Sequence, residues 1–437
     1  MSLLDKASII ITPTAYDVGS INAIKPKESP FGDLDFTRAT SGSAVGTANR
    51  ENADGVLEEV AQNVPRIDYL GGEGHWLIEP EARNTATYSN DFTQGTLFNG
   101  GSGAGIDFAV LTSAQATSPD GNNNAWKFED NDDGNNGRVT LRYFGTTINS
   151  GDYNVVSLFV KKQGNNDWFS IALAEYDVAS AIAFFNISNG TLGTVASSLT
   201  ANIEDYGDGW YRISVTFTTT TDVSGAVQFR LAEGDNDIDF TRDGTYGAYI
   251  YGIQAESSTN ANATKPTSYI PTSGSQVTRA EDGFGLNTTL DTSLINSTEG
   301  TFYVEMAALD NNLINRNISL SDGNDSNTIR FEYKDVSNQL KTSVKVGTSQ
   351  ASFITTSYDI TDFLKIGLRF KENDFACFVN GSQVGVTDTF GSTFPPNTLN
   401  HIKSSRGGSA LAFEGKVKCI AVFKEGLTDS ELTCLTS

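Results

Sequence analysis

Cysteine and histidine are both scarce in this chain of 437 residues. The three cysteines, Cys377, Cys419 and Cys434, have no CxxC spacing, and their odd number argues against a disulfide framework or a zinc site. The two histidines are His75 and His401, and no GxSxG motif accompanies them. The sequence therefore gives little support to nucleophilic catalysis. We expect a protein that is not an enzyme and that folds in a reducing compartment.

Basic side chains are few as well. The chain has 30 lysines and arginines against 53 aspartates and glutamates, which gives a formal net charge of −23. Such a surface repels nucleic-acid backbones and anionic lipids, because contacts to phosphate need lysine and arginine. We therefore expect no nucleic-acid partner. An acidic surface favours solubility and can hold divalent cations.

Long apolar runs are missing too. None reaches the roughly 18 residues that a membrane helix requires, so we expect no membrane insertion. The first residues, Met1 to Lys6, lack the basic region and apolar stretch of a signal peptide. If the protein acts outside a cell, we expect it to leave by lysis rather than by secretion.

Helical periodicity is nearly absent, and short alternating strands separated by polar, glycine-rich turns dominate. Residues 210–217 show the pattern best: Tyr211, Ile213 and Val215 alternate with polar side chains, so one face enters a core. Turns such as Asn380-Gly381 favour tight hairpins. We predict an all-β protein in which an N-terminal attachment segment is followed by two β-sandwich (jelly-roll) domains.

The predicted domains are residues 1–84, 85–270 and 277–437. The first region has short apolar clusters without a clear period and would bury little by itself, so we expect it to pack on a neighbour, another subunit or a larger particle. A proline-bearing connector, with Pro266 and Pro271, lies at the end of the second region and leads to the third. Near the end of the third, Thr428 and Glu431 form a capping box that predicts a short helix.

Several phrases of the sequence resemble a known class of protein. Residues 35–84, which contain "DFTRATSGSAVGTANRENADG", "VPRIDY" and "WLIEPEARN", resemble the entry segment of phage and prophage virion proteins of the tail-fibre, tail-associated or head-fibre type. The phrases "NIEDYGDGWYRISVTFT" at 202–218 and "PTSYIPTSGSQVTRAED" at 266–282 resemble the carbohydrate-binding-like jelly roll of these proteins. The third region resembles concanavalin A-like and laminin G-like sandwiches, through "LKIGLRFKENDFACFVNGSQV" and "FEGKVKCIAVFKEGLTDSEL".

This resemblance implies a non-enzymatic structural protein on the virion surface, made in the host cytoplasm. It would present its sandwiches for adhesion to host or mucosal surface glycans and contact other virion proteins through the N-terminal segment. The resemblance also suggests a homo-oligomer, with a trimer as our guess. Two alternatives stay open: a purely structural capsid or tail decoration protein that binds no sugar, and a polysaccharide-degrading tail enzyme.

Glycan recognition needs an aromatic ring that stacks on a sugar, with polar side chains that bond its hydroxyls. Trp168 follows a polar turn and is a candidate platform; the alternative is that it begins a core strand. Trp210 and Arg212 share one face of the alternating strand at 210–217, so they either face a ligand or cover a neighbouring sheet or subunit. Tyr249 and Tyr251 share a face with each other and could join either site.

Three acidic clusters are candidate calcium sites, because calcium binds six to eight oxygen ligands. The first, and the favoured one, contains Asp130, Asp132 and Asp133, the second contains Asp235 and Asp237, and the third contains Asp322 and Asp325. None has the spacing of an EF-hand loop. The alternative for each is a solvated acidic turn. No other cofactor is indicated.

Overall fold

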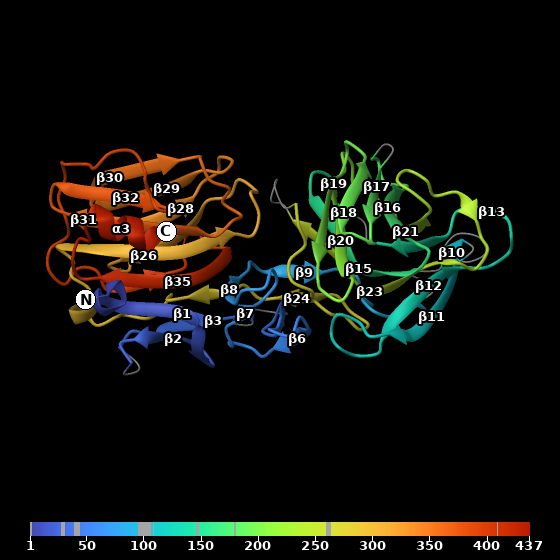
Figure 1. The fold of residues 1–437 in the computed structure, drawn as a ribbon, viewed down its shortest axis with the longest axis horizontal. Helices are drawn as coiled ribbons and strands as arrows, with labels where there is room; N and C mark the ends of the chain where they lie inside the picture. The colour runs from blue at the N-terminus through green and yellow to red at the C-terminus, as the bar shows by residue number, and fades with distance from the viewer. Residues whose placement is uncertain are drawn as a thin grey trace. The chain divides into compact units, whose positions relative to one another are not determined.

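The structure is a computed structural model that describes residues 2–27, 31–38, 44–94, 106–107, 109–145, 148–178, 181–258, 264–408 and 410–437. Strands dominate throughout, which confirms the predicted all-β class (Figure 1). No helix among these residues is long and apolar enough to cross a membrane.

The chain forms two compact units. Unit 1 comprises Met1–Ser41, Val60–Glu81 and Ala280–Ser437, and unit 2 comprises Gly42–Glu59 and Ala82–Arg279. The first 84 residues are thus divided between the two units. Their predicted role in attachment to other virion proteins stays a prediction.

Unit 1 is built on two sheets. The larger has the strand order β25-β3-β2-β1-β35-β26-β31-β32-β33, with β8 and β7 joined to β35. Its strands are β25 (Gly283–Phe284), β3 (Leu34–Thr37), β2 (Ser20–Lys25), β1 (Ala7–Asp17), β35 (Gly415–Phe423), β26 (Glu299–Ala308), β31 (Leu364–Lys371), β32 (Asp374–Val379), β33 (Ser382–Gln383), β8 (His75–Ile78) and β7 (Ile67–Asp68).

The second sheet of unit 1 has five strands in the order β30-β29-β28-β27-β34. These are β30 (Thr348–Thr355), β29 (Leu340–Val346), β28 (Asn327–Tyr333), β27 (Arg316–Ser321) and β34 (His401–Lys403). Alternate residues of both sheets meet in one apolar core, where the rings of Phe302 and Phe331 stack with centroids 5.0 Å apart. The core faces of the two sheets fix which side chains point outward, because successive side chains alternate along a strand.

The N-terminal strand β1 lies inside the larger sheet, between β2 and β35. Ile9 and Ile11 of β1 pair with Val422 and Ile420 of β35, and both isoleucines are buried in the core. The run of isoleucines therefore buries its apolar side chains within unit 1.

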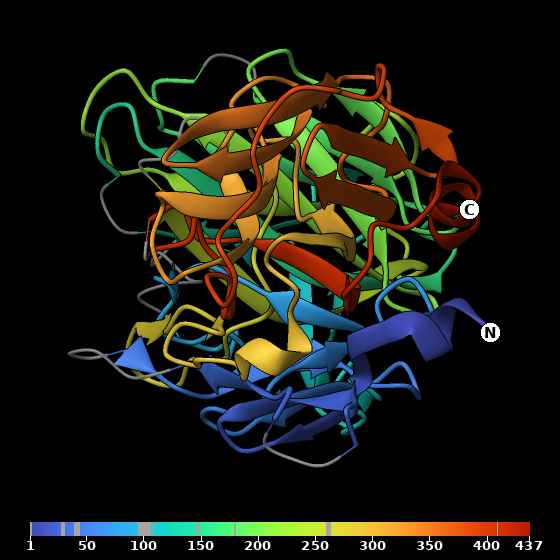
Figure 2. The same cartoon turned by 90° about the vertical axis from the view of Figure 1, so that its left-hand side faces the viewer.

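Two local predictions in unit 1 are confirmed. The turn at Asn380-Gly381 has positive φ at both residues and joins β32 to β33. Thr428 and Glu431 form the predicted capping box of α3 (Asp429–Thr436), which buries Leu432. α3 packs against β31 and β32 (Figure 2).

Unit 2 is a sandwich of two six-stranded sheets. The first has the order β10-β14-β21-β16-β17-β18, with strands β10 (Ile106–Asp107), β14 (Thr140–Phe144), β21 (Ala226–Ala232), β16 (Trp168–Ala174), β17 (Ile182–Asn186) and β18 (Thr191–Val195). The second has the order β11-β12-β23-β15-β20-β19, with strands β11 (Ala109–Ala116), β12 (Ala125–Asp130), β23 (Tyr246–Ser258), β15 (Tyr153–Gly164), β20 (Trp210–Thr218) and β19 (Thr200–Asp205).

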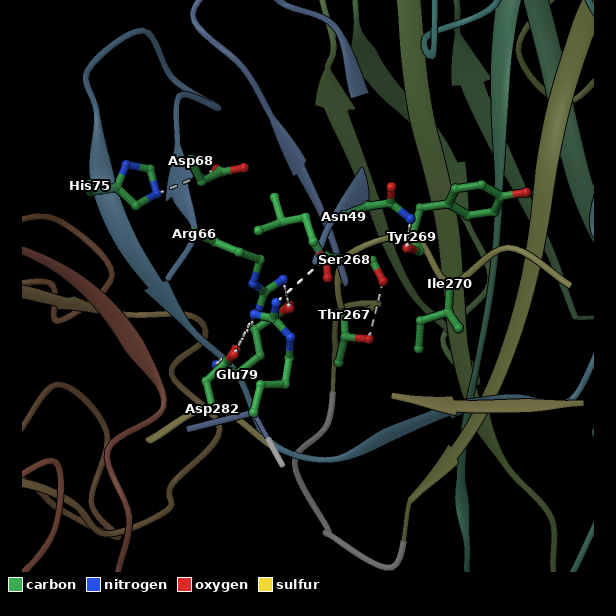
Figure 3. A network of polar contacts seen from close by, with 12 residues as sticks. Asn49, Arg66, Asp68, His75, Glu79, Thr267, Ser268, Tyr269, Ile270 and Asp282 are labelled. Carbon is green, nitrogen blue, oxygen red and sulfur yellow. Dashed lines mark hydrogen bonds and ion pairs between the residues drawn. The ribbon is translucent and has the colours of Figure 1, made fainter. Parts of the chain in front are cut away.

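Short strands attach the early residues of unit 2 to its sandwich. β24 (Val277–Arg279) pairs with β4 (Ala44–Val45) and with β9 (Ala82–Asn84). The fully buried Asn84 amide donates to Ile270 O at 2.8 Å, and its Oδ1 accepts from Ala86 N and Ala255 N at 3.0 Å each. Asn49 Nδ2 donates to Tyr269 O at 2.8 Å (Figure 3).

A buried charge network joins distant segments of unit 1. The Asp282 carboxylate binds the guanidinium groups of Arg38, at 3.1 Å, and of Arg66, while Arg66 also bonds Glu79 at 2.7 Å (Figure 3). Backbone Glu79 N donates to the same carboxylate at 3.0 Å. All four side chains come from the phrases that carry the family resemblance. In this structure those residues therefore hold the fold together.

Candidate functional site

The outer face of the β15–β20–β23 sheet in unit 2 carries four of the predicted glycan-binding residues, and two segments cover it. Trp210 is only 2% exposed, and its Nε1 donates to Thr117 O at 3.1 Å. Arg212 is also 2% exposed. Its Nη1 donates to Thr267 O at 2.7 Å, and its Nη2 donates to Ser157 Oγ at 3.1 Å.

Tyr251 is enclosed on the same face. Its hydroxyl donates to Asp120 Oδ2 at 2.9 Å, and its ring lies 5.6 Å from that of Tyr269 and 6.0 Å from that of Phe159. Burial raises the pKa of Tyr251 well above its ordinary value and raises the pKa of Tyr269 to about 12. Both hydroxyls therefore stay protonated at neutral pH.

Trp210, Arg212 and Tyr251 are thus covered by other segments of the chain, so the prediction that they face a ligand is wrong. Alternation along β20 and β23 correctly put these side chains on the side away from the core. It could not show that residues 117–120 and 264–270 return over that side. Tyr249 is different: it remains partly exposed, between Lys127 of β12 and Lys161 of β15 in the sheet register.

Trp168 lies on the outer face of the other sheet of unit 2, where it is half-buried at the start of β16. Its register partners are Asn186 of β17 and Ala232 of β21. The ring lies beside Gly193: a Cβ on that glycine would stand 2.5 Å from Trp168 Cζ3 and 2.5 Å from Asp235 Oδ1. The lack of a side chain at Gly193 therefore lets an aromatic ring and a carboxylate lie close together.

Polar side chains continue this face across the sheet. In the register, Thr140 pairs with Arg230 and Arg230 pairs with Ser170. In the next row, Arg142 pairs with Gln228, and Gln228 Oε1 accepts a hydrogen bond from Arg230 Nη2. The opposite side chains of these strands, such as Phe229 and Ile171, lie in the core.

Ser170 Oγ and Arg142 Nε, which are buried atoms of this face, have no hydrogen-bond partner among the described residues. We call the set of Trp168, Arg142, Ser170, Gln228 and Arg230 the Trp168 face. It combines an aromatic ring with guanidinium, amide and hydroxyl groups, which is the chemistry that a saccharide requires. Of these five residues, only Trp168 was a predicted site residue. Alternation in residues 226–232, where Gln228 and Arg230 interrupt an apolar run, was the available signal for the others.

The predicted calcium ligands in the first acidic cluster have other partners. Asp130 is 3% exposed and accepts from Asp132 N at 2.9 Å, Gly244 N at 2.7 Å and Tyr246 N at 3.2 Å. Asp133 accepts from Arg242 Nε at 3.0 Å and Nη2 at 2.8 Å, and these bonds lower the pKa of Asp133 well below its ordinary value.

The second acidic cluster also serves local structure. Asp235 accepts from Thr194 N at 2.7 Å and from Thr194 Oγ1 at 3.0 Å, while Asp237 accepts from Asp239 N at 3.3 Å. Within the described ranges, no three His, Cys, Asp or Glu side chains are grouped so that they could hold a metal ion. Most of the predicted ligand oxygens already accept N–H or O–H donors, so the residues present do not fit a calcium site.

His75 and the enclosed cysteines lie in structural settings. His75 is buried, with Nδ1 2.9 Å from Glu73 O, and burial, with a smaller effect of Lys416, lowers its pKa to about 4. Burial raises the pKa of Cys377 and of Cys419 to about 12 each. Both thiols are therefore protonated and unreactive at neutral pH.

An open depression of about 510 Å³ in unit 1 is lined by two carboxylates, Glu299 and Glu372, together with Lys371 and Phe394. Lys371 Nζ lies 3.1 Å from Glu299 Oε2. A pair of carboxylates at a groove is the arrangement that glycoside hydrolysis uses. The depression is therefore the place where the enzymatic alternative can be tested.

Comparisons with known proteins give only distant similarity. No protein-family model matches the chain, and no curated protein matches it. The carbohydrate-binding module CBM40 of the Ruminococcus gnavus IT-sialidase, bound to alpha2,3 sialyllactose, is similar at 15% identity and a TM-score of 0.28, over 32% of this chain and 83% of that one.

Two larger structures are similar at the same level. Domains LG4-5 of the mouse laminin alpha1 chain match at 11% identity and a TM-score of 0.23, over 67% of this chain and 92% of that one. The Trypanosoma rangeli sialidase in complex with sialic acid matches at 11% identity and a TM-score of 0.26, over 93% and 81% of the two chains. At these values, the similarity assigns no function to this chain.

Proposed function

We propose that this chain is a non-enzymatic surface protein of a virion fibre or of a tail or head appendage, and that it binds host or mucosal surface glycans. The observation that carries the glycan-binding part is the Trp168 face. There a half-buried indole ring lies beside Asp235, and the buried atoms Ser170 Oγ and Arg142 Nε, which have no hydrogen-bond partner in the described part of the chain, lie in the same sheet face. The resemblance of residues 35–84 and 266–282 to virion proteins supports the virion part.

The chemistry of this face suits weak, reversible adhesion. An indole ring can stack on the C–H face of a pyranose, while Arg230, Gln228 and Ser170 bond its hydroxyls. Buried polar atoms without partners favour a ligand that supplies them, because an unsatisfied buried group costs about 1–3 kcal/mol. Several copies on one particle would multiply a weak affinity, so a homo-oligomer, with a trimer as our guess, belongs to the proposal.

The test is a glycan array probed with the full chain. We expect binding to a subset of neutral surface glycans, and we expect Trp168→Ala to weaken it by about tenfold, which corresponds to about 1.4 kcal/mol. Phe390→Ala is the matched control, because Phe390 is 80% exposed and lies in unit 1. An array without hits would favour the purely structural decoration role and overturn the proposal.

Hydrolysis is the second candidate, and the depression with Glu299 and Glu372 is the observation that favours it. Incubation of the full chain with any polysaccharide that it binds should release no new reducing ends. Release that disappears in Glu299→Gln or Glu372→Gln would replace the adhesion proposal with an enzymatic one.

A further inference from the structure

The outer face of the five-stranded sheet in unit 1 is built of polar side chains in register. Arg330 of β28 pairs with Ser343 of β29 on one side and with Ser319 of β27 on the other. The row continues to Ser352 of β30 and Lys403 of β34. Direct partners in an antiparallel sheet share a face, so these five side chains point the same way. Their strand neighbours, among them Ile329, Phe331 and Val344, lie in the core.

This face is cationic in a chain whose net charge is −23. Lys341 and Lys345 flank Ser343 at two-residue spacing and thus lie on the same face. Asp325 Oδ1 lies 3.0 Å from Arg330 Nη1 and 3.4 Å from Arg406 Nε, and Asp325 Oδ2 lies 3.4 Å from Lys345 Nζ. One carboxylate is therefore shared by three cations, which leaves excess positive charge.

Two further cations of the face have no acidic partner. Among the described residues, no carboxylate lies within ion-pair distance of Lys341 or of Lys403. Glu332, the register partner of Lys341, contacts Lys334 at 3.5 Å instead. The cations of this face therefore exceed the acids: Arg330, Lys341, Lys345, Lys403 and Arg406 against Asp325 and Glu332.

Buried polar atoms without partners mark the centre of the face. Arg330 is 6% exposed and Ser343 is 4% exposed, and within the described part of the chain neither Arg330 Nε nor Ser343 Oγ has a hydrogen-bond partner. The two residues are direct register partners. Burial, assisted by the charge of Arg406, lowers the pKa of Arg330 below its ordinary value. An added anion would relieve this repulsion and satisfy both donors.

We propose that this face, composed of Arg330, Lys341, Ser343, Lys345 and Lys403 and here called the Arg330 face, binds an anionic saccharide whose charge is a carboxylate or a sulfate ester. The guanidinium and ammonium groups meet the anion, and Ser343 and Ser352 bond sugar hydroxyls. A short charged sugar meets only the local positive field, whereas a long polyanion such as nucleic acid also meets the repulsion of the whole acidic chain. The inference goes beyond the proposed function, since it concerns a second site in the other unit.

The test is calorimetric titration of the full chain with trigalacturonate and with its uncharged methyl ester. We expect the acid to bind about tenfold or more tightly than the ester, and its affinity to fall as NaCl rises from about 0.05 to 0.3 M. In a second titration, the ligand is a sulfated trisaccharide. Preference for it over trigalacturonate would assign the anion to a sulfate ester, and the reverse preference would assign it to a carboxylate.

The variant Lys341→Gln/Lys345→Gln removes two charges and leaves Asp325 paired with Arg330 and Arg406. We expect it to weaken the binding of the anionic sugar by about tenfold or more. Lys424→Gln, on an exposed position of unit 1, is the control and should bind normally. Binding of neither anionic sugar, or unchanged binding by the double variant, would overturn the proposal, as would equal binding of a single-stranded DNA oligomer.

The two sites can fail separately. Trp168→Ala should leave binding of the anionic sugar unchanged, and Lys341→Gln/Lys345→Gln should leave the neutral hits of the glycan array unchanged. A loss of anionic binding in Trp168→Ala would show that the Arg330 face is not the site.

Discussion

Two arginines, Arg212 in unit 2 and Arg330 in unit 1, make an instructive comparison. Each lies in an alternating strand, points away from its core and is nearly buried, with 2% and 6% exposure. Arg212 donates to Thr267 O and to Ser157 Oγ beneath a covering segment. Arg330 shares its one carboxylate, Asp325, with two other cations. Among the described residues, both arginines also keep a buried Nε without a hydrogen-bond partner. Neither burial nor an unpaired Nε therefore separates a structural arginine from a binding one; the covering segment and the surrounding charge do.

The polar side chains of the molecule thus fall into two groups: those enclosed by other segments of the chain, here called enclosed, and those on an outward face with excess charge, here called open. Enclosed groups with protein partners should affect stability and leave ligand binding unchanged. Open groups with incomplete partners should affect binding and leave stability unchanged.

The largest effect on stability is expected from Asp282→Ala. The change leaves Arg38 and Arg66 buried without their shared carboxylate. Removing one partner of a buried charge network costs about 3–5 kcal/mol of unfolding free energy. Urea unfolding of the full chain measures this loss of unfolding free energy. Glu372→Ala, at an exposed position, is the control, and its unfolding free energy should lie within about 0.5 kcal/mol of that of the unchanged chain. Equal effects of the two variants would contradict the division.

A smaller loss is expected from Arg212→Met. It removes the donors to Thr267 O and Ser157 Oγ and should lower the free energy of unfolding by about 2–3 kcal/mol. Arg138→Met is the matched control, because that side chain is 54% exposed. Binding on the glycan array should persist in both variants. If Arg212→Met abolished binding while it stayed folded, Arg212 would belong to a site after all.

Acid should destabilise the folded protein through the enclosed His75. Its folded pKa of about 4 is below the ordinary value of 6.5, so the unfolded chain takes up the proton first as the pH falls. Stability is full above pH 6.5 and declines toward pH 4, with a loss of about 2 kcal/mol between pH 7 and pH 5 from this group. Unfolding at both pH values measures the loss. His75→Gln should lack this part of the pH dependence, and an unchanged slope in that variant would show that other groups cause it.

The smallest effect on stability is expected from Lys341→Gln. This side chain is partly exposed and has no ion pair with any residue that the structure describes, so the unfolding free energy should change by less than about 0.5 kcal/mol. The same variant should nevertheless bind trigalacturonate more weakly. A loss of unfolding free energy comparable to that of Arg212→Met would place Lys341 among the enclosed groups and contradict the division into enclosed and open groups.

Much of the local structure could be predicted from the sequence. Alternation in residues 210–217 identified β20, Asn380-Gly381 identified a hairpin turn, and Thr428 with Glu431 identified the cap of α3. These features depend on side-chain period and on local backbone preferences, which a few neighbouring residues determine. The candidate site was harder to predict: the sequence indicated Trp168 as a glycan-binding residue and Asp235 as a calcium ligand, but not that the two lie together. Their proximity arises where two distant segments meet at Gly193.

The sequence by itself determined that the protein is made of sheets and which side of each strand enters a core, because side chains alternate along a strand whatever surrounds it. Only the tertiary structure decided which outward faces are available. Residues 264–270 return over one sheet of unit 2, while the cations of β28 and β29 keep partnerless donors on an outward face of unit 1. The covering of a face depends on contacts between residues far apart in the chain, and no local pattern encodes them.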